Sequence, residues 1–222
     1  MEPSAPPLRS AQPGELFERF QHNAERANAE VHRCLSPADA VEVALRVMRR
    51  ERVANAPGRY ALWAPCPLLE SLDRAPLLAR MPGLRLQVDR GLAAQARVGL
   101  SQMQFGLADT GTLVQDATAV AERLVSSLVR VHIAFLASAS LAPSLGALIA
   151  RLRPERASYL AFITGPSRTA DIERVLTIGV HGPRQLVIVC VDDLDEQDTP
   201  SPADGRATAA AAGPRGHSGA SP

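Results

Sequence analysis

The sequence contains no lysine, since all 24 of its basic residues are arginine. This absence excludes Schiff-base chemistry on a lysine and the phosphate-binding lysine of a Walker motif. The 24 basic residues nearly balance 23 acidic ones, and no basic stretch is interleaved with aromatic side chains on which bases could stack. We therefore expect no nucleic-acid partner.

Cysteine is also scarce. Cys34, Cys66 and Cys190 lie far apart, and no Cys-x-x-Cys or Cys/His cluster has metal-ligand spacing. We therefore expect no metal and no cofactor in this chain, because neither an iron–sulfur cluster nor a structural zinc fits such cysteines. Cys190 lies in an apolar run and is predicted to be a buried, inert thiol. Cys66, between two prolines, is interpreted as a loop thiol, and a catalytic role is the less favoured alternative.

Long apolar runs are missing as well. The longest, from Leu186 to Val191, ends at two aspartates and falls well short of the roughly 18 residues of a membrane-spanning helix. The opening segment MEPSAPPLRSAQPGE has prolines and acids instead of the apolar core of a secretory signal. The sequence therefore predicts no membrane span and a cytoplasmic location.

The two ends of the chain differ from its middle in composition. Residues 1–14 and 196–222 are rich in Pro, Gly, Ser and Ala without apolar periodicity, so they cannot bury enough surface to offset the entropy of ordering. We expect both to be disordered tails. Residues 15–195 are predicted to form a single domain, long enough for one well-filled core.

Two amphipathic helices are predicted before the first strand. Apolar residues recur at three- and four-residue spacing from Glu15 to Arg33, with charged residues on the other face. A second helix begins at Ser36-Pro37, where Ser36 can cap its first turn, and is expected to end near Arg52. Together they predict an N-terminal helical hairpin that packs on the sheet or reaches a partner.

The remainder alternates short β-prone runs with helical stretches. The helical stretches include Pro143 to Leu152 and Arg168 to Leu176. The predicted strands are Tyr60–Ala64, Leu84–Val88, Val98–Leu100, Thr112–Val114, Val131–Leu136, Tyr159–Ile163 and Leu186–Val191. This pattern predicts an α/β fold with a mainly parallel sheet and helices on both faces. In such sheets ligands bind at the carboxyl ends of the strands, so we expect the site there.

Two segments carry candidate binding residues. In GLADTGTLVQ (106–115) the candidates are Asp109, Thr110, Gly111 and Thr112, and the glycine allows close backbone approach. In ITGPSRTADIE (163–173) the candidates are Gly165, Ser167, Arg168, Thr169 and Asp171, at a predicted helix start whose amides, hydroxyls and guanidinium suit an anion. Purely structural helix capping is the alternative for this loop. The spacing of a nucleotide-binding loop is absent.

A histidine occupies a third segment, GVHGP at 179–183. His181 stands between two glycines before the last predicted strand, which makes it the best-placed general acid or base in the sequence. A turn histidine that only bonds a carbonyl is an equally open alternative. His132, inside VHIAFL, is interpreted as a core or sheet-face residue, and His22, His32 and His217 receive no role.

At these three segments the chain resembles the lactate utilisation protein C family, whose members are single LUD domains. The matching stretches are ADTGT at 108–112, ITGPSRTADIE at 163–173 and GVHGP at 179–183, in the family's order and at its usual separations. An LFERF-like helix at 16–20 also fits, and the resemblance extends from about Leu16 to Asp192.

The resemblance implies a fold like that of the CoA transferases, ribose-5-phosphate isomerase and the 5-formyltetrahydrofolate cyclo-ligases. It also implies a place in a bacterial system that oxidises L-lactate to pyruvate and whose other subunits carry iron–sulfur clusters. The lack of clustered cysteine here agrees with that division of labour.

Three functions remain open. In an enzyme component, Arg168 would pair with the lactate carboxylate, His181 would take the hydroxyl proton, and Asp109 would orient His181 or the substrate. In an accessory or regulatory subunit without catalytic power, the same motifs would bind a small anion or brace an interface. A phosphosugar or CoA-ester enzyme rests on fold analogy alone and ranks last.

Overall fold

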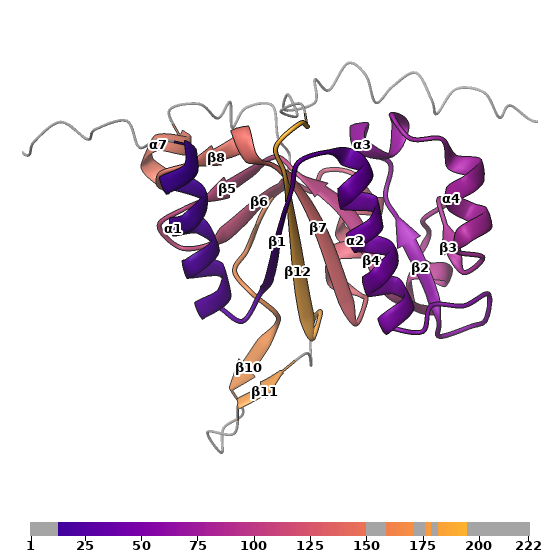
Figure 1. The fold of residues 1–222 in the computed structure, drawn as a ribbon. Helices are drawn as coiled ribbons and strands as arrows, with labels where there is room; N and C mark the ends of the chain where they lie inside the picture. Colours follow the sequence, from indigo (N-terminus) through magenta and orange to yellow (C-terminus); the bar gives the residue numbers. More distant parts are fainter. Residues whose placement is uncertain (1–12, 150–158, 171–175, 179–181, 195–222) are drawn as a thin grey trace, which may run out of the picture.

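We describe a computed structural model of the chain, in which residues 13–149, 159–170, 176–178 and 182–194 are described (Figure 1). Both predicted tails therefore lie almost entirely outside the described residues. In chain order the elements are α1 (Pro13–Arg26), β1 (Glu30–Cys34), α2 (Pro37–Arg50), β2 (Tyr60–Trp63), α3 (Pro67–Glu70), α4 (Arg74–Arg80), β3 (Leu84–Arg85), α5 (Arg90–Ala93), β4 (Ala96–Met103), β5 (Phe105–Leu107), β6 (Thr112–Asp116), α6 (Val120–Ser127), β7 (Val131–Ala137), the 3₁₀ turn η1 (Ser138–Ser140), β8 (Leu141–Ala142), α7 (Leu145–Ile149), β9 (Leu160–Ile163), β10 (Arg168–Ala170), β11 (Leu176–Ile178) and β12 (Gln185–Val191).

A six-stranded sheet forms the centre of the molecule. Its order is β1-β12-β7-β4-β2-β3, and every neighbouring pair is parallel. The apolar runs of β7 and β12 are buried along nearly their whole length, as expected for strands covered on both faces. The predicted α/β fold with a mainly parallel sheet is confirmed.

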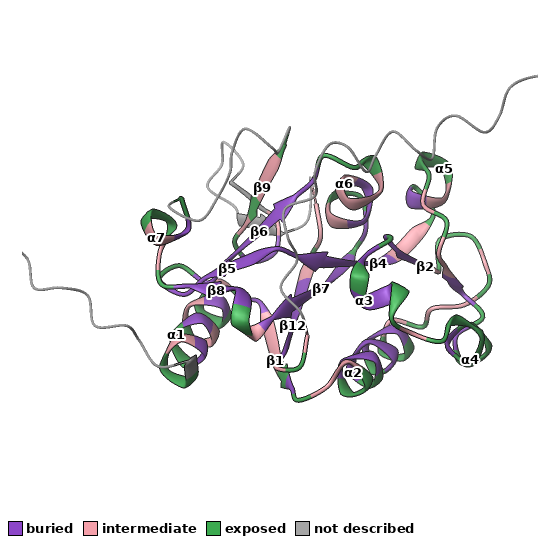
Figure 2. Ribbon diagram, turned by 90° about the horizontal axis from the view of Figure 1, so that it is seen from above, coloured by how far each residue is buried: buried purple, intermediate pink, exposed green. Residues whose placement is uncertain are grey.

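Helices cover both faces of this sheet, as predicted (Figure 2). The sheet therefore separates the apolar core on one face from that on the other. On one face, α2, α3 and α4 pack on alternate strand residues such as Ile133 and Val189. On the other face, α1 packs on the intervening residues such as Ala134 and Ile188, and α5 and α6 pack beside β2 and β4. Among the described residues, no helix combines the length and apolar content that crossing a bilayer requires.

A second sheet lies on the α1 side of the first. Its order is β8-β5-β6-β9, and β5 follows β4 directly in the chain through Gln104. The Gln104 side-chain carbonyl accepts a hydrogen bond from the Asp116 amide at 2.6 Å. Leu113 of β6 joins the apolar cluster formed by α1, β7 and β12, so one face of the second sheet packs against the first.

The predicted N-terminal helical hairpin is wrong. Helix α1 ends at Arg26, where Asn28 takes a positive φ of 67°, a conformation that terminates helices and that asparagine tolerates. The next residues form β1, which pairs with β12 and separates α1 from α2. His32 therefore lies in a strand. The charged face that suggested a longer helix belongs in part to an edge strand, whose first four residues are all partly or fully exposed.

The predicted helix from Arg168 to Leu176 is also wrong in its described part. Arg168–Ala170 forms β10, which pairs antiparallel with β11 as a hairpin of its own. This hairpin projects beyond the end of the large sheet (Figure 1). Its start is fixed by the Ser167 amide, which donates to the Pro183 carbonyl at 2.8 Å instead of opening a helix. Within the predicted helix from Pro143 to Leu152, the described part contains α7.

Candidate functional site

A cavity of about 550 Å³ lies at one edge of the large sheet. Three of its walls immediately precede parallel strands: Ala27 precedes β1, Ser126 and Ser127 precede β7, and Gly182 and Pro183 precede β12. The fourth wall is the end of β9 and the loop that follows it, Phe162 to Ser167. The cavity is therefore at the amino ends of the parallel strands, and the expectation of a site at their carboxyl ends is wrong for this cavity.

Two of the three sequence segments are joined by a row of hydroxyl groups. The Thr110 and Thr112 Oγ1 atoms are 2.8 Å apart, and Thr112 Oγ1 is 2.8 Å from Thr164 Oγ1. Thr164 lines the cavity, Thr112 is buried, and Thr110 is exposed. The turn between β5 and β6 is thus tied to the cavity wall, and Thr112 supports Thr164 from behind.

Close backbone packing explains two of the predicted glycines. Gly111 has φ of 67°, and a Cβ there would lie 2.2 Å from the Ala24 amide nitrogen in α1. Gly165 has φ of 70°, and a Cβ there would lie 2.1 Å from the Ala27 carbonyl oxygen. Only glycine suits both the conformation and the space. These contacts bring the first two segments against the end of α1.

The second segment also meets the third. Besides the hydrogen bond from the Ser167 amide to Pro183, a Cβ on Gly182 would lie 3.0 Å from the Ser167 Cβ. Ser167, Gly182 and Pro183 all line the cavity. The described parts of the second and third segments therefore line one cavity, and the first segment is tied to its wall through the contact of Thr112 with Thr164.

The remaining predicted site residues are placed unevenly. Asp109 is exposed at the β5–β6 turn, and no described contact of its carboxylate ties it to the cavity. Arg168 and Thr169 belong to β10 directly after the cavity residue Ser167. A helix start that binds an anion is absent there, since the backbone is extended. His181 and Asp171 lie outside the described residues.

Sequence reasoning missed several cavity residues. Ser126 and Ser127 end an ordinary helix, α6, and carry no motif. Thr164 lies in the segment ITGPSRTADIE, but its hydroxyl was passed over in favour of Gly165, Ser167 and Arg168. Ala27 signals nothing by itself, because it lines the cavity only through the chain reversal after α1. The useful signal was the pair of glycines, which mark where backbone segments touch.

The described cavity lining is polar but uncharged, with hydroxyls from Ser126, Ser127, Thr164 and Ser167. Positive charge lies close by in the chain: Arg130 and Arg184 are exposed, and the Arg184 amide donates to the Arg130 carbonyl at 2.8 Å. Neither guanidinium forms an ion pair with a residue that the structure describes. This end of the sheet therefore carries positive charge next to the amino ends of β7 and β12.

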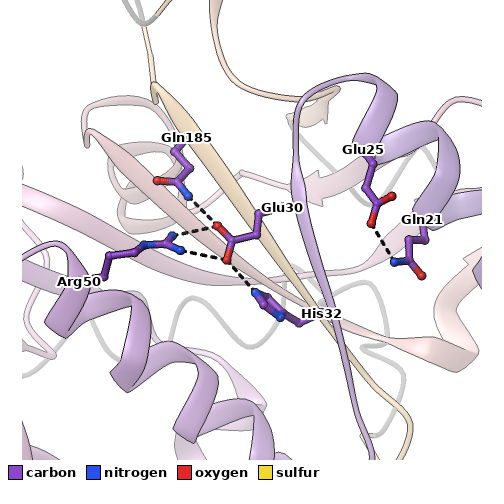
Figure 3. Close-up of polar contacts among 6 residues, drawn as sticks. All are labelled: Gln21, Glu25, Glu30, His32, Arg50 and Gln185. Atoms are coloured by element: carbon purple, nitrogen blue, oxygen red, sulfur yellow. Dashed lines mark hydrogen bonds and ion pairs between the residues drawn. The ribbon is translucent and has the colours of Figure 1, made fainter.

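The carboxylate of Glu30, at the same edge of the large sheet, makes structural contacts instead of lining the cavity (Figure 3). Glu30 accepts two hydrogen bonds from Arg50, at 3.1 and 2.9 Å, one from Gln185 at 2.7 Å, and contacts His32 Nε2 at 2.8 Å. Partial burial raises the pKa of Glu30, but the Arg50 and His32 contacts outweigh it and lower the pKa below its usual value. Because all its oxygens are engaged, Glu30 joins α2, β1 and β12 structurally.

The thiols offer no reactive group in the described structure. Cys34, Cys66 and Cys190 are buried and free, and burial is the main cause that raises the pKa of each. A raised pKa disfavours the nucleophilic thiolate. The prediction of a buried Cys190 is confirmed, and Cys66 does lie in the loop between β2 and α3, where it too is buried. No cluster of metal-ligating side chains occurs among the described residues.

The chain has clear relatives. The model of the LUD domain family matches residues 17–191. Lactate utilization protein C of Bacillus subtilis is 36% identical over 161 residues, covering 65% of this chain and 67% of that protein. The protein of the same name from an Exiguobacterium species is 29% identical, covering 84% and 82%. In the Geobacillus protein of that name the match covers 44% of the relative's length.

A solved structure shares the fold. The DUF162 family protein from Deinococcus radiodurans has a TM-score of 0.55 and 17% identity, covering 82% of this chain and 99% of that one. At this identity the likeness concerns the fold alone. Because the family model spans nearly all of the described α/β structure, and the Exiguobacterium and Bacillus subtilis relatives are both named lactate utilization protein C, the chain belongs to the LUD domain family, in its lactate utilisation protein C branch.

Proposed function

We propose that this protein is a cytoplasmic component of an L-lactate utilisation system and binds a small 2-hydroxy acid in the cavity at the amino edge of the large sheet. The names of its relatives supply the substrate class. In this proposal iron–sulfur partner subunits accept the electrons when lactate becomes pyruvate, and this chain holds no cofactor of its own.

The observation that carries the proposal is a hydroxyl-lined cavity at which two segments distant in sequence meet, with the third segment hydrogen-bonded to its wall. Neutral hydroxyls bind both the carboxylate and the hydroxyl of a hydroxy acid, since each can donate and accept. Nearby arginines favour an anion over a neutral sugar. A CoA ester or phosphosugar gains no support beyond the fold.

Within this proposal, each predicted site residue has a role that follows from its position. Ser167 and Thr164 contact the ligand from the cavity wall, and Thr112, with Thr110 and Gly111 in the same turn, orients Thr164. Arg168 and Thr169 contribute from β10, which follows Ser167, and Gly165 gives the loop its path. Asp171 is assigned to the same ligand on its sequence position alone. His181 takes the hydroxyl proton, and Asp109 orients His181 or the substrate.

Binding measurements on the purified chain test the proposal. Calorimetric titration with L-lactate should give saturable binding, and Thr164→Val should weaken it by roughly 0.5–1.5 kcal/mol, the usual contribution of one hydrogen bond. Ser71→Ala is the control, because Ser71 follows α3 on the opposite face of the sheet and its hydroxyl donates to the Leu68 carbonyl. Unchanged affinity in Thr164→Val would remove the cavity from the proposal.

The accessory role is the second candidate, and it draws support from the cavity lining itself. The described lining contains no charged side chain, histidine or cysteine, so binding without chemistry is fully compatible with it. His181→Ala separates the two candidates in the assembled system. An enzyme component loses lactate oxidation and keeps lactate binding, whereas an accessory subunit keeps both.

A further inference from the structure

Three arginines stand side by side at the amino edge of the large sheet, and we call them the arginine row. Arg97 is the second residue of β4, Arg130 directly precedes β7, and Arg184 directly precedes β12. The Arg130 amide donates to the Arg97 carbonyl at 3.1 Å, and the Arg184 amide donates to the Arg130 carbonyl at 2.8 Å. The three residues therefore follow one another at the spacing of adjacent strands, roughly 4.8 Å.

The described residues around the arginine row do not neutralise it. Arg97 Nε donates to Glu51 at 3.2 Å, whereas Arg130 and Arg184 are exposed and form no ion pair with a described residue. Glu30, at the same edge, already accepts hydrogen bonds from α2 and β12 (Figure 3). Because like charges on adjacent strands destabilise a sheet, stability does not account for the row.

Two exposed apolar side chains lie beside the cavity at this edge. Phe162 lines the cavity and is 50% exposed, and Leu128, which directly follows the cavity residue Ser127, is 54% exposed. Arg130 is two residues beyond Leu128 in the chain. Protein interfaces combine an apolar centre, enriched in aromatic side chains and arginine, with a polar rim. The surface around the cavity has this composition.

The proposed function brings a partner to this surface. L-lactate loses two electrons and two protons when it becomes pyruvate, and under that proposal the electrons pass to an iron–sulfur subunit. This subunit has to approach the cavity, and the surface that it meets there carries exposed arginines. An acidic protein surface complements them, which speeds encounter and fixes orientation.

We propose that the arginine row, together with Phe162 and Leu128, is the docking surface for an acidic face of the iron–sulfur subunit that accepts the electrons. This inference rests on the proposed function and specifies which side of the chain the redox partner covers. The whole chain has 24 basic and 23 acidic residues. It therefore lacks the excess of positive charge with which proteins bind nucleic acids or anionic membranes.

The test measures association of the full chain with the iron–sulfur subunits of the same lactate utilisation system, purified without this chain. Wild-type association should weaken at least about fivefold when ionic strength rises from roughly 0.05 M to 0.5 M, because salt screens exposed charges. At the lower ionic strength, Arg184→Glu should weaken association about tenfold or more. Arg74→Glu is the matched control, because it makes the same change of charge at the start of α4, a helix that follows β2 and so begins at the opposite edge of the sheet. Its effect should be less than about twofold.

A second variant tests the apolar part of the surface. Leu128→Ser should weaken association by a similar factor at both ionic strengths, since salt does not screen apolar burial. Leu128 and Arg184 are both exposed, so both variants should keep the wild-type melting temperature. The wild type should bind neither vesicles of anionic lipid nor a single-stranded oligonucleotide, and such binding, if Arg184→Glu abolished it, would reassign the row and overturn the inference.

The outcomes separate this inference from the proposed function. Equal effects of Arg184→Glu and Arg74→Glu, or an association indifferent to Leu128→Ser, overturn the docking surface and leave the proposed function standing. A wild type that binds L-lactate but not the iron–sulfur subunits overturns the docking surface and the partner assignment, and leaves the binding cavity. A wild type that binds neither overturns the proposed function as well.

Discussion

Glu122 shows how one residue couples folding to pH. It lies in the first turn of α6 and is half-buried. Burial, helped by the nearby Asp116 charge and opposed by Arg123, raises the pKa of Glu122 to about 7. Between the ordinary pKa of 4.5 and about 7, the unfolded chain has lost this proton while the folded chain keeps it. The contribution of Glu122 to stability therefore falls as pH rises through this window.

Glu122→Gln should remove this dependence. We expect the variant to match the wild type near pH 5 and to exceed its free energy of unfolding by about 1–2 kcal/mol at pH 8, less than the whole shift would give because solvent reaches the side chain. Denaturant titrations at both pH values measure this. Glu18→Gln, on the exposed face of α1, is the control. A variant that loses as much stability as the wild type between pH 5 and pH 8 would contradict the assignment.

At the scale of elements, the sequence correctly predicted the strands whose apolar residues are buried on both faces of the sheet. The apolar runs of β7 and β12 left no alternative to central strands, and Ser36 caps α2 as expected, with its hydroxyl accepting from the Asp39 amide. Strand β1 was missed because one turn at Asn28 converts a helical pattern into an edge strand. The β10–β11 hairpin was missed because Ser167 bonds across to Pro183, a contact between residues that local propensity cannot register.

The candidate site was also predicted only in part, because some of its residues carry a local sequence signal and others meet only through contacts between distant segments. Gly165 and Ser167 signal a special backbone in the sequence and do meet at the cavity. The general rule for parallel sheets places ligands at the carboxyl ends of the strands, so it did not predict a cavity at their amino ends. The cavity lies there because the loop after β9, a strand of the second sheet, packs against the amino ends of the parallel strands.

The contact of Gly165 with the end of α1 yields a prediction for an element junction. Gly165→Ala must fit a Cβ against the Ala27 carbonyl, so we expect a loss of about 3 kcal/mol, or roughly 6–12 °C in melting temperature for a domain of this size. Gly58→Ala is the matched control, because Gly58 has φ of 77° but no atom near its Cβ position. Its cost should be only about 1 kcal/mol. Equal losses would mean that conformation, not contact, sets the penalty.

At the scale of the whole molecule, the described residues form a cavity but include no recognisable group that can accept two electrons. Its cysteines are buried and separate, and its described residues include no metal-ligating cluster. Oxidation of lactate needs such an acceptor. Under the proposed function, the chain therefore contributes binding and proton transfer, and the acceptor belongs to the assembled system.

The purified chain should accordingly bind L-lactate without oxidising it. Incubated with L-lactate and an artificial electron acceptor, it should form no pyruvate above background, and elemental analysis should find no stoichiometric iron or zinc, because a two-electron step requires a redox centre that this chain is proposed to lack. Co-purification of the native assembly should restore turnover. The assembly rebuilt with Thr164→Val should turn over more slowly at subsaturating lactate, and its Ser71→Ala counterpart should match the wild type. Sustained pyruvate formation by the isolated chain would instead place the redox centre here and refute the division of labour between subunits.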